Sequence, residues 1–351
     1  MMGGGQEVEN GMEELMTSYD QMGLVEAASD NSLIVIAGAG GFIGGHLARE
    51  LISLGYDKIR CVDIKPQQDW YQSFDQCENL VFDLADKQNC ETVLKDADFV
   101  FNLACNMGGM GFIENNRALC MLSVLINTHL LMAAKENHLK RFLFSSSACV
   151  YNADKQIDPS VTALREDDAY PAMPEDGYGW EKLFSERMCR HFTEDFGIET
   201  RIARFHNVYG PNGTYDGGRE KAPAAICRKV INAKLEGKRD IEIWGDGEQS
   251  RSFLYIDDGI EGLIRIFNSD VSHPLNLGSD QLVTINQLVD IIESIAGIKL
   301  NRKYKLNAPL GVRGRNSDNA LIKSSIDWAP SIRLEDGLEK TYAWIYDQMA
   351  V

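Results

Sequence analysis

The sequence predicts an α/β protein in which a doubly wound parallel sheet is joined to a smaller α/β lobe at the C-terminal end. Two observations lead to this fold class. Up to about residue 205, short runs of β-branched and apolar residues alternate with segments of helical length. Beyond that point the alternation gives way to loops rich in Gly, Pro and Asn. The chain has 351 residues, of which 44% are hydrophobic, so each of two lobes can bury a core.

The elements of the sheet are assigned in chain order. The run LIVIA at 33–37 is short, β-branched and followed by glycines, which is typical of a buried parallel strand. Similar runs give the other strands, and the segments between them have the length of crossover helices. We expect strands at 33–37, 58–63, 80–83, 99–104, 141–145 and 199–205. We expect helices at 44–54, 89–95, 115–137 and 179–196.

Charge and cysteine content argue against several classes of protein. The chain has 35 Lys and Arg against 52 Asp and Glu, and its net charge of −17 is unsuited to a nucleic-acid or anionic membrane surface. No run of about 18 apolar residues is present, so we expect no membrane span. The eight cysteines are scattered without a CxxC pair, which predicts free thiols in a reducing cytoplasm and no metal site.

A glycine-rich turn follows the first expected strand and opens the first expected helix. Its glycines are Gly38, Gly41 and Gly44, each three positions apart. Such glycines let the backbone approach a pyrophosphate, and the helix N-terminus offers free N–H groups to the phosphates. Asp63 ends the second strand, where a carboxylate binds ribose hydroxyls and disfavours a 2′-phosphate. This pattern predicts a Rossmann-type site for NAD rather than NADP.

Residues at the ends of neighbouring strands are expected to line the same site. The pair at 83–84 follows the third strand and suits the adenine edge, and the segment at 102–104 ends the fourth strand beside the cofactor. Outside the glycines and Asp63, the expected cofactor contacts are Phe42, Ile43, Asp83, Leu84 and Leu103.

A Tyr-x-x-x-Lys pair spans the start of the expected helix at 179–196. A spacing of four places Tyr178 and Lys182 on one helix face. A nearby ammonium and the positive nicotinamide lower the pKa of a phenol, so that it can accept a hydroxyl proton near neutral pH. The serines at 145–147 follow the fifth strand and offer hydroxyls to the same substrate oxygen. We expect Tyr178 and Lys182 to contact the cofactor as well.

Together these motifs resemble the extended short-chain dehydrogenase/reductase family over about residues 31 to 345. That family combines the glycine spacing, a Ser…Tyr…Lys set and a C-terminal lobe that binds a nucleotide sugar. A narrower resemblance, to the GDP-mannose 3,5-epimerase family, rests on five blocks in the same order. These blocks are 107–113, 146–151, 204–211, 217–225 and 311–319.

The narrower resemblance implies that Cys149 and Lys221 are an acid/base pair. Most relatives of the wider family have Thr where this chain has Cys149. In this chemistry Tyr178 takes the proton of the sugar O4 while NAD takes the C4 hydride, and the resulting ketone acidifies C3–H and C5–H. A thiolate and an ammonium on opposite faces of the ring can then invert these carbons. The hydride finally returns to C4, so no net oxidation occurs.

A nucleotide sugar carries a diphosphate, for which the second lobe should supply cations. Guanidinium groups match phosphate oxygens, so Arg251 and either Arg313 or Arg315 are candidates. The resemblance adds further substrate contacts. The expected substrate site contains Gly108, Gly109, Ser146, Ser147, Ala148, Asn207, Glu220, Lys221, Ala222, Lys229, Gln249, Arg251, Arg313 and Arg315.

These expectations define a function and its alternatives. The resemblance implies an NAD-dependent isomerase that converts GDP-mannose to GDP-L-galactose, GDP-L-gulose or both. The alternatives are a 4-epimerase, dehydratase or decarboxylase of another nucleotide sugar, and a non-catalytic NAD-binding regulatory protein. A 4,6-dehydratase is disfavoured because it typically needs an Asp-Glu pair beside position 149, where this chain has Ala148 and Val150.

The same reasoning divides the chain and predicts its assembly. We expect an N-terminal arm at 1–30, helical at 12–28, and an NAD-binding Rossmann domain at 31–205 plus about 252–280. The nucleotide-sugar-binding lobe should comprise 206–251 and 281–351. By analogy with the family we expect a homodimer, formed by the helices at 115–137 and 179–196.

Overall fold

The computed structural model describes residues 32–350, and the arm predicted at 1–30 lies outside them. The central element is a seven-stranded parallel sheet with the order β11-β6-β5-β4-β1-β2-β3. Its strands are β1 (Ile34–Ala37), β2 (Ile59–Asp63), β3 (Glu78–Val81), β4 (Phe99–Asn102), β5 (Arg141–Ser147), β6 (Glu199–Phe205) and β11 (Leu275–Leu277). The strand order reverses between β1 and β4, which is where open α/β sheets bind their ligands.

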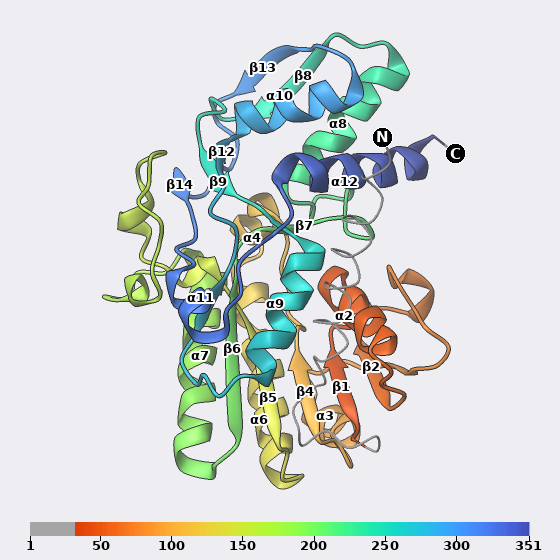
Figure 1. The fold of residues 1–351 in the computed structure, drawn as a ribbon, viewed down its shortest axis with the longest axis vertical. Helices are drawn as coiled ribbons and strands as arrows, with labels where there is room; N and C mark the ends of the chain where they lie inside the picture. Colours follow the sequence, from red (N-terminus) through yellow and green to blue (C-terminus); the bar gives the residue numbers. More distant parts are fainter. Residues whose placement is uncertain (1–31, 351) are drawn as a thin grey trace, which may run out of the picture.

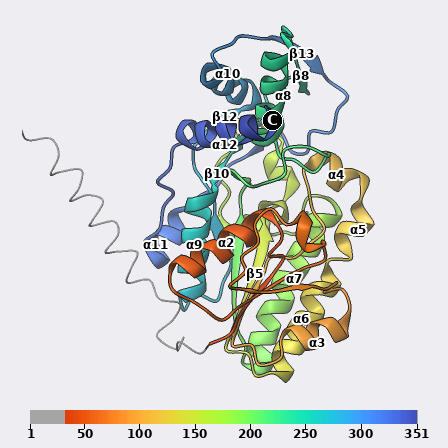
Figure 2. The same cartoon turned by 90° about the vertical axis from the view of Figure 1, so that its right-hand side faces the viewer.

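Helices cover both faces of the sheet (Figures 1 and 2). One face carries α2 (Phe42–Ser53) and α9 (Ile256–Asn268), which also contact each other. The other face carries α3 (Lys87–Val93), α6 (Val124–Glu136) and α7 (Asp176–Phe196). Because side chains alternate along a strand, Ile34 and Ile36 face the first core, whereas Val35 and Ala37 face the second.

The smaller part of the molecule lies above the sheet in Figure 1. Its helices are α8 (Ala222–Glu236), α10 (Ile285–Ala296) and α12 (Leu334–Met349), which pack against one another. Its short strands are β8 (Asp240–Trp244), β13 (Asn301–Lys305), β9 (Ser250–Ser252), β12 (Leu282–Thr284) and β14 (Gly314–Arg315). The remaining elements are β7 (Val208–Tyr209), β10 (Leu254–Tyr255) and α11 (Ala320–Ile326).

Most elements agree with the sequence analysis, including the helix expected at 115–137, which the structure divides. It corresponds to α5 (Arg117–Met121) and α6, separated by a turn at 122–123, and a further helix, α4 (Met110–Asn115), precedes it. Asn116 lies between α4 and α5 with φ −132° and ψ 39°, and its side-chain amide donates to the Phe112 carbonyl at 2.8 Å. Side-chain competition of this kind separates α4 from α5.

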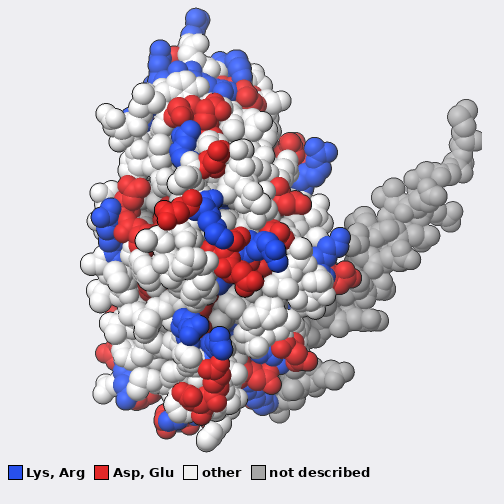
Figure 3. All heavy atoms as spheres, turned by 90° about the vertical axis from the view of Figure 1, so that its left-hand side faces the viewer, with Lys and Arg blue, Asp and Glu red and all other residues white. Residues whose placement is uncertain are grey.

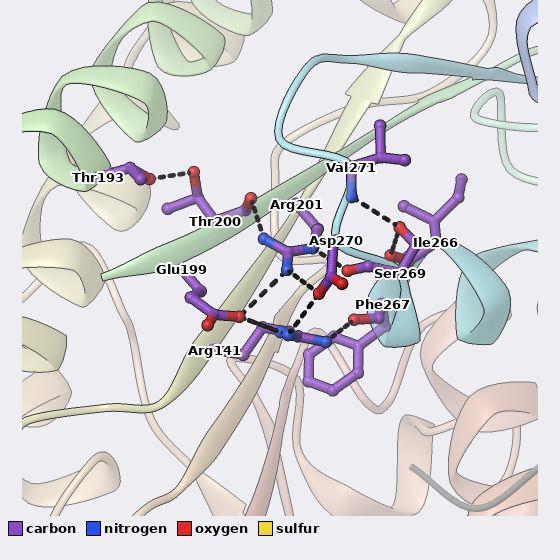
Figure 4. Close-up of polar contacts among 10 residues, drawn as sticks. All are labelled: Arg141, Thr193, Glu199, Thr200, Arg201, Ile266, Phe267, Ser269, Asp270 and Val271. Carbon is purple, nitrogen blue, oxygen red and sulfur yellow. Dashed lines mark hydrogen bonds and ion pairs between the residues drawn. The ribbon is translucent and has the colours of Figure 1, made fainter. Parts of the chain in front are cut away.

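Two buried arginines tie the lower edge of the sheet to the loop after α9 (Figure 4). Arg141 of β5 donates to Glu199 and to the Phe267 carbonyl, each at 2.8 Å. Arg201 of β6 donates to the Ser269 carbonyl at 2.5 Å. These bonds hold the loop that leads into β11, the one strand of the sheet that the sequence analysis did not assign.

The stretch Arg117–Glu136, which contains α5 and α6, has the length and mean hydropathy of a membrane-crossing helix, with a value of 1.5. Leu130 and Leu131 of this stretch are fully buried beneath the sheet. Part of its apolar character therefore belongs to the protein core. Figure 3 shows basic and acidic side chains interspersed over the face turned to the viewer.

Candidate active site

The glycine-rich turn connects β1 to α2. Gly38 has φ +86°, and a Cβ there would lie 2.9 Å from backbone atoms of Leu103 and Ala104. A Cβ at Gly44 would lie 2.2 Å from the Gly38 carbonyl oxygen. Glycine is therefore required at both positions, and α2 begins directly after Gly41 with its N-terminus at the edge of the sheet.

Acidic and apolar residues surround this turn as a dinucleotide site requires. Asp63 is buried at the end of β2, and its Oδ1 accepts the N–H of Lys65 at 3.0 Å. Leu84 is buried directly after Asp83, and the Leu103 N–H donates to the Ala37 carbonyl at 2.9 Å. The glycine cradle and the carboxylate of Asp63 therefore fit a bound NAD.

Lys65 is a residue of this site that the sequence analysis missed. Its Nζ donates to the carbonyl of Gly40 inside the glycine turn and lies 4.5 Å from the centroid of the Tyr71 ring. Burial lowers the pKa of Lys65, whereas the nearby Asp63 and Asp69 raise it. A lysine two positions after a strand does not by itself predict a site residue, because its contact with the glycine turn depends on the path of the folded chain.

The Tyr–Lys pair lies in the first two turns of α7, and both side chains are buried. Ser147 at the end of β5 hydrogen-bonds the Tyr178 hydroxyl. Lys182 Nζ lies 5.6 Å from the Tyr178 ring centroid and forms an ion pair with Glu181 Oε2 at 3.7 Å, but within residues 32–350 no N or O atom forms a hydrogen bond with it. A buried ammonium with hydrogen-bonding capacity left over is suited to a ribose hydroxyl, which supports the same fit to NAD.

The ionisation of Tyr178 differs from the expectation of a lowered pKa. Burial raises the pKa of Tyr178 well above its usual value, and the charges of Cys105 and Cys149 raise it further. The phenol is therefore a neutral group poised to donate or accept a hydrogen bond.

Cys149 and Lys221 come to this same region from distant parts of the chain. Cys149 lies in η2 (Ala148–Val150), directly after β5, and packs with Tyr178 and Cys120. Lys221 is the N-cap residue of α8. Burial raises the pKa of the Cys149 thiol and lowers the pKa of Lys221, while the charge of Cys149 raises that of Lys221. A thiol and an amine that both favour their neutral forms can exchange protons with a bound substrate.

The structure distinguishes the two arginines that the sequence left open. Arg313 points outward and forms two ion-pair bonds with Asp246, at 3.0 and 3.1 Å. Arg315 is buried and donates from Nη1 to Cys149 Sγ at 3.5 Å. Arg251 donates to three backbone carbonyls, and burial lowers its pKa to about 10. Arg315 therefore contacts Cys149 directly, and Arg251 interacts electrostatically with it.

Known proteins resemble this chain in sequence and in fold. Residues 34–278 match the model of the NAD dependent epimerase/dehydratase family. The chain belongs to this family. GDP-mannose 3,5-epimerase 1 of Oryza sativa subsp. indica is 47% identical over 328 residues, which cover 92% of this chain and 83% of the rice protein.

Solved structures share the fold of this chain. The UDP-glucose 4-epimerase of Thermotoga maritima superposes with a TM-score of 0.81 at 23% identity, covering 90% of this chain and 99% of that one. The UDP-glucuronic acid 4-epimerase of Bacillus cereus, solved with UDP-glucuronic acid and NAD, has a TM-score of 0.75 at 25% identity. The superposed region covers 90% of this chain and 99% of the Bacillus cereus chain.

Within this NAD-dependent epimerase fold, several expected substrate residues make bonds to the protein itself. Ser146 donates to Glu186 on the far side of β5, at 2.5 Å. Lys229 donates to the Glu242 carbonyl at 2.9 Å, and Gln249 donates to the Trp244 carbonyl at 2.8 Å. The roles expected of these residues toward a substrate stay predictions.

Other expected residues shape the loops around the site. Asn207 has φ +42° and donates to the Ser252 carbonyl at 3.1 Å. Glu220 accepts from Gly218 N at 2.7 Å and from Arg228 at 2.8 Å, and Ala222 begins α8. A Cβ at Gly109 would lie 2.5 Å from the Glu220 carbonyl oxygen, and one at Gly108 would meet Phe112 at 2.8 Å. These glycines are thus required by loop packing.

Glu175 and Cys105 are site residues that the sequence analysis did not single out. Glu175 precedes α7 and forms an ion pair with Arg315 at 2.6 Å. Cys105 follows the fourth strand, and its thiol raises the pKa values of both Lys182 and Lys221. Neither residue belongs to a recognisable motif spacing, so tertiary contact alone identifies it.

Proposed function

We propose that this chain is a GDP-mannose 3,5-epimerase, which inverts C5 and C3 of the hexose to give GDP-L-galactose, GDP-L-gulose or both. The observation that carries the proposal is the convergence of Cys149 and Lys221 on the Tyr178 region. A simple C4 epimerase has no use for a thiol and an amine placed there. The identity to the rice GDP-mannose 3,5-epimerase, over most of both chains, supports the same substrate.

The residues would share the chemistry as follows. When bound, NAD would supply a reversible hydride acceptor for C4. Tyr178, oriented by Ser147, takes the proton of the O4 hydroxyl, and Lys182 holds the ribose. The ketone formed at C4 acidifies the hydrogens on C3 and C5.

Cys149 and Lys221 would then exchange protons with these carbons. They lie on separate elements, η2 and the N-terminus of α8, so they can approach the ring from different sides. One group removes a proton from one face while the other delivers a proton to the opposite face. Inversion follows, whereas a single group acting alone would return the proton to the face it came from.

Arg251 would bind the diphosphate. It donates to carbonyls of the 310–312 segment, and its guanidinium can exchange these bonds for phosphate oxygens after a small rearrangement of that segment. Arg315 lies directly beyond the segment, but Gln156, Glu175 and Cys149 occupy its donors. Arg313 would stay paired with Asp246 and hold the loop in place.

A homodimer is part of the proposal. Exposed apolar side chains gather where α5 and α6 pack against α7, which is a face of adjoining helices. They are Met121, Leu122, Leu125, Trp180 and Phe184, with exposed fractions of 48, 54, 38, 45 and 55%. An apolar patch of this kind marks a protein interface, and a second copy of the chain is the occupant that the family suggests.

The function is tested by incubating the purified protein with NAD and GDP-mannose and identifying the hexose after mild hydrolysis. Appearance of L-galactose or L-gulose is the expected result. UDP-glucose and UDP-glucuronic acid serve as controls, because a 4-epimerase of another nucleotide sugar would convert one of them and leave GDP-mannose unchanged. A protein that binds NAD but converts none of the three would be a non-catalytic member of the family.

A further inference from the structure

A buried carboxylate, Glu175, lies beside the reactive thiol of the site. Glu175 precedes α7, and its Oε2 accepts from Arg315 Nη2 at 2.6 Å. The side chains of the two residues are 10 and 5% exposed, so this ion pair is buried. Burying charges costs free energy unless they are paired, so the carboxylate and the guanidinium depend on each other.

Arg315 is held in one orientation by three contacts. Its Nε donates to Gln156 Oε1 at 2.7 Å, and its Nη2 is bound by Glu175. Gln156 is fully buried and donates to the carbonyls of Tyr151 and Asn152, both at 3.3 Å. With Nε and Nη2 occupied, Nη1 faces Cys149 Sγ at 3.5 Å.

Glu175 is also joined to Cys149 through the backbone. The N–H of Glu175 donates to the Cys149 carbonyl at 2.9 Å. Carboxylate, guanidinium and thiol therefore belong to one closed ring of contacts. Helix capping does not explain the acid, since the Glu175 side chain caps no N–H of α7. Its Oε1 has no hydrogen-bond partner within residues 32–350.

Glu175 differs in charge from the other titratable groups around Cys149. The titratable groups that interact with the thiol are Glu175, Tyr178, Lys221, Arg251 and Arg315. Burial raises the pKa of Cys149, Arg315 lowers it, and Glu175 raises it again. Glu175 is the carboxylate of this set, so it opposes the stabilisation of the thiolate by the cations.

We propose that Glu175 is a positioning residue that aims Arg315 at Cys149 and limits how strongly this guanidinium stabilises the thiolate. An acid/base group must give up a proton as readily as it takes one. A thiolate held by an uncompensated arginine would be too weak a base to remove a carbon-bound proton. The catalytic value of this device rests on the proposed function, but its effect on the thiol does not.

The test measures the ionisation of Cys149 in the protein without sugar. Alkylation by iodoacetamide is followed from about pH 6 to about pH 10, because the thiolate is the reactive form. Peptide mass spectrometry reads the rate at Cys149 separately from the other seven of the eight cysteines. The variant Glu175→Gln keeps the shape of the side chain and removes its charge.

We expect Glu175→Gln to lower the pKa of Cys149 by about one to two units, the effect of one neighbouring charge. Glu261→Gln is the matched control, since Glu261 pairs with Arg265 at 2.8 Å on α9, and it should leave the pKa of Cys149 unchanged. An unchanged or raised value in Glu175→Gln would overturn the proposal.

Arg315→Lys is the second variant, and it tests the positioning role if Glu175→Gln does not fold. The lysine keeps a positive charge but cannot bind Gln156, Glu175 and Cys149 together, so the pKa of Cys149 should rise. An unchanged pKa in this variant would contradict the positioning role. If the thiol titrates as expected and GDP-mannose is not epimerised, the proposed function fails while this inference stands.

Discussion

Gly179 lies against the Cys149 carbonyl so closely that a Cβ on this glycine would sit 2.3 Å from the oxygen. This contact brings the first turn of α7, with Tyr178, against the turn that carries Cys149. Backbone packing therefore joins the two halves of the catalytic set.

Gly179→Ala should push α7 away from η2. We expect the free energy of unfolding to fall by about 1–3 kcal/mol, which is typical of overpacking at a site that cannot yield. Turnover should fall more than NAD affinity, because Tyr178 and Cys149 lose their relative placement. Gly259→Ala in α9 is the control, since its nearest contact is an ordinary 3.5 Å. Thermal unfolding and steady-state rates measure both variants, and equal behaviour of the two would refute the argument.

Asp63→Ala should weaken the binding of NAD by about 1–3 kcal/mol, the scale of hydrogen bonds to a charged group. The reason is the buried carboxylate at the end of β2, beside the glycine turn. Isothermal titration calorimetry measures the change, with Asp57→Ala on the exposed loop before β2 as the control. Tighter binding of NADP than of NAD by the parent protein would show that the cofactor preference is wrong.

Replacing Phe184 by Asp should convert a dimer into a monomer. Phe184 is 55% exposed on α7, next to Trp180 and the exposed residues of α5 and α6. A charge in the middle of an apolar interface is costly to bury. Leu306→Asp, at a residue that is 67% exposed on the other part of the molecule, should leave the dimer intact. Sedimentation at micromolar concentration checks this, and a monomeric parent protein would remove the basis for the dimer.

Acid should destabilise the protein partly through His206. Burial lowers the pKa of His206 to about 3, and its ring nitrogen lies 2.9 Å from Asn276 Oδ1. In the unfolded chain this histidine becomes protonated near pH 6.5. Between pH 6.5 and about 3 the unfolded state therefore binds more protons than the folded state. Stability must then fall as pH falls through this window.

The measurement is the slope of unfolding free energy against pH for the parent and for His206→Gln. The parent slope should be steeper by up to ~1.4 kcal/mol per pH unit, the value for one proton. His273→Gln, at an exposed histidine, should keep the parent slope. Identical slopes for parent and His206→Gln would mean that His206 does not titrate as burial implies.

The sequence was sufficient for features that depend on local pattern. The β-branched runs predicted β1, β2, β4, β5 and β6 closely, because buried parallel strands have a composition of their own. The turn at Gly38 was predictable since its spacing follows from how backbone must approach phosphate. The three-residue strand β11 was not, because it is too short to show a period and is placed by its pairing with β6.

The same limit applies to the site. Tyr178 and Lys182 share a helix face, so their proximity follows from spacing alone. Arg313 and Arg315 are two residues apart, so the alternation of an extended segment would place both on one face, but the structure buries Arg315 and leaves Arg313 partly exposed. The partners Gln156 and Glu175 decide it, and they are 159 and 140 positions away from Arg315. Long-range partners of this kind are fixed only by the folded chain.

The most direct test of the central claim is the incorporation of solvent deuterium into GDP-mannose by the parent protein and by Cys149→Ala. The parent should place deuterium at C5 and C3 of the hexose, as read by NMR in heavy water. Cys149→Ala removes one small thiol and leaves Tyr178 and Lys182 in place, so NAD binding and C4 oxidation should persist. Loss of a positioned acid or base should slow exchange at C5 and C3 by about 10²–10⁴-fold. Epimerisation by Cys149→Ala at close to the parent rate would contradict the assignment of Cys149 as an acid/base group.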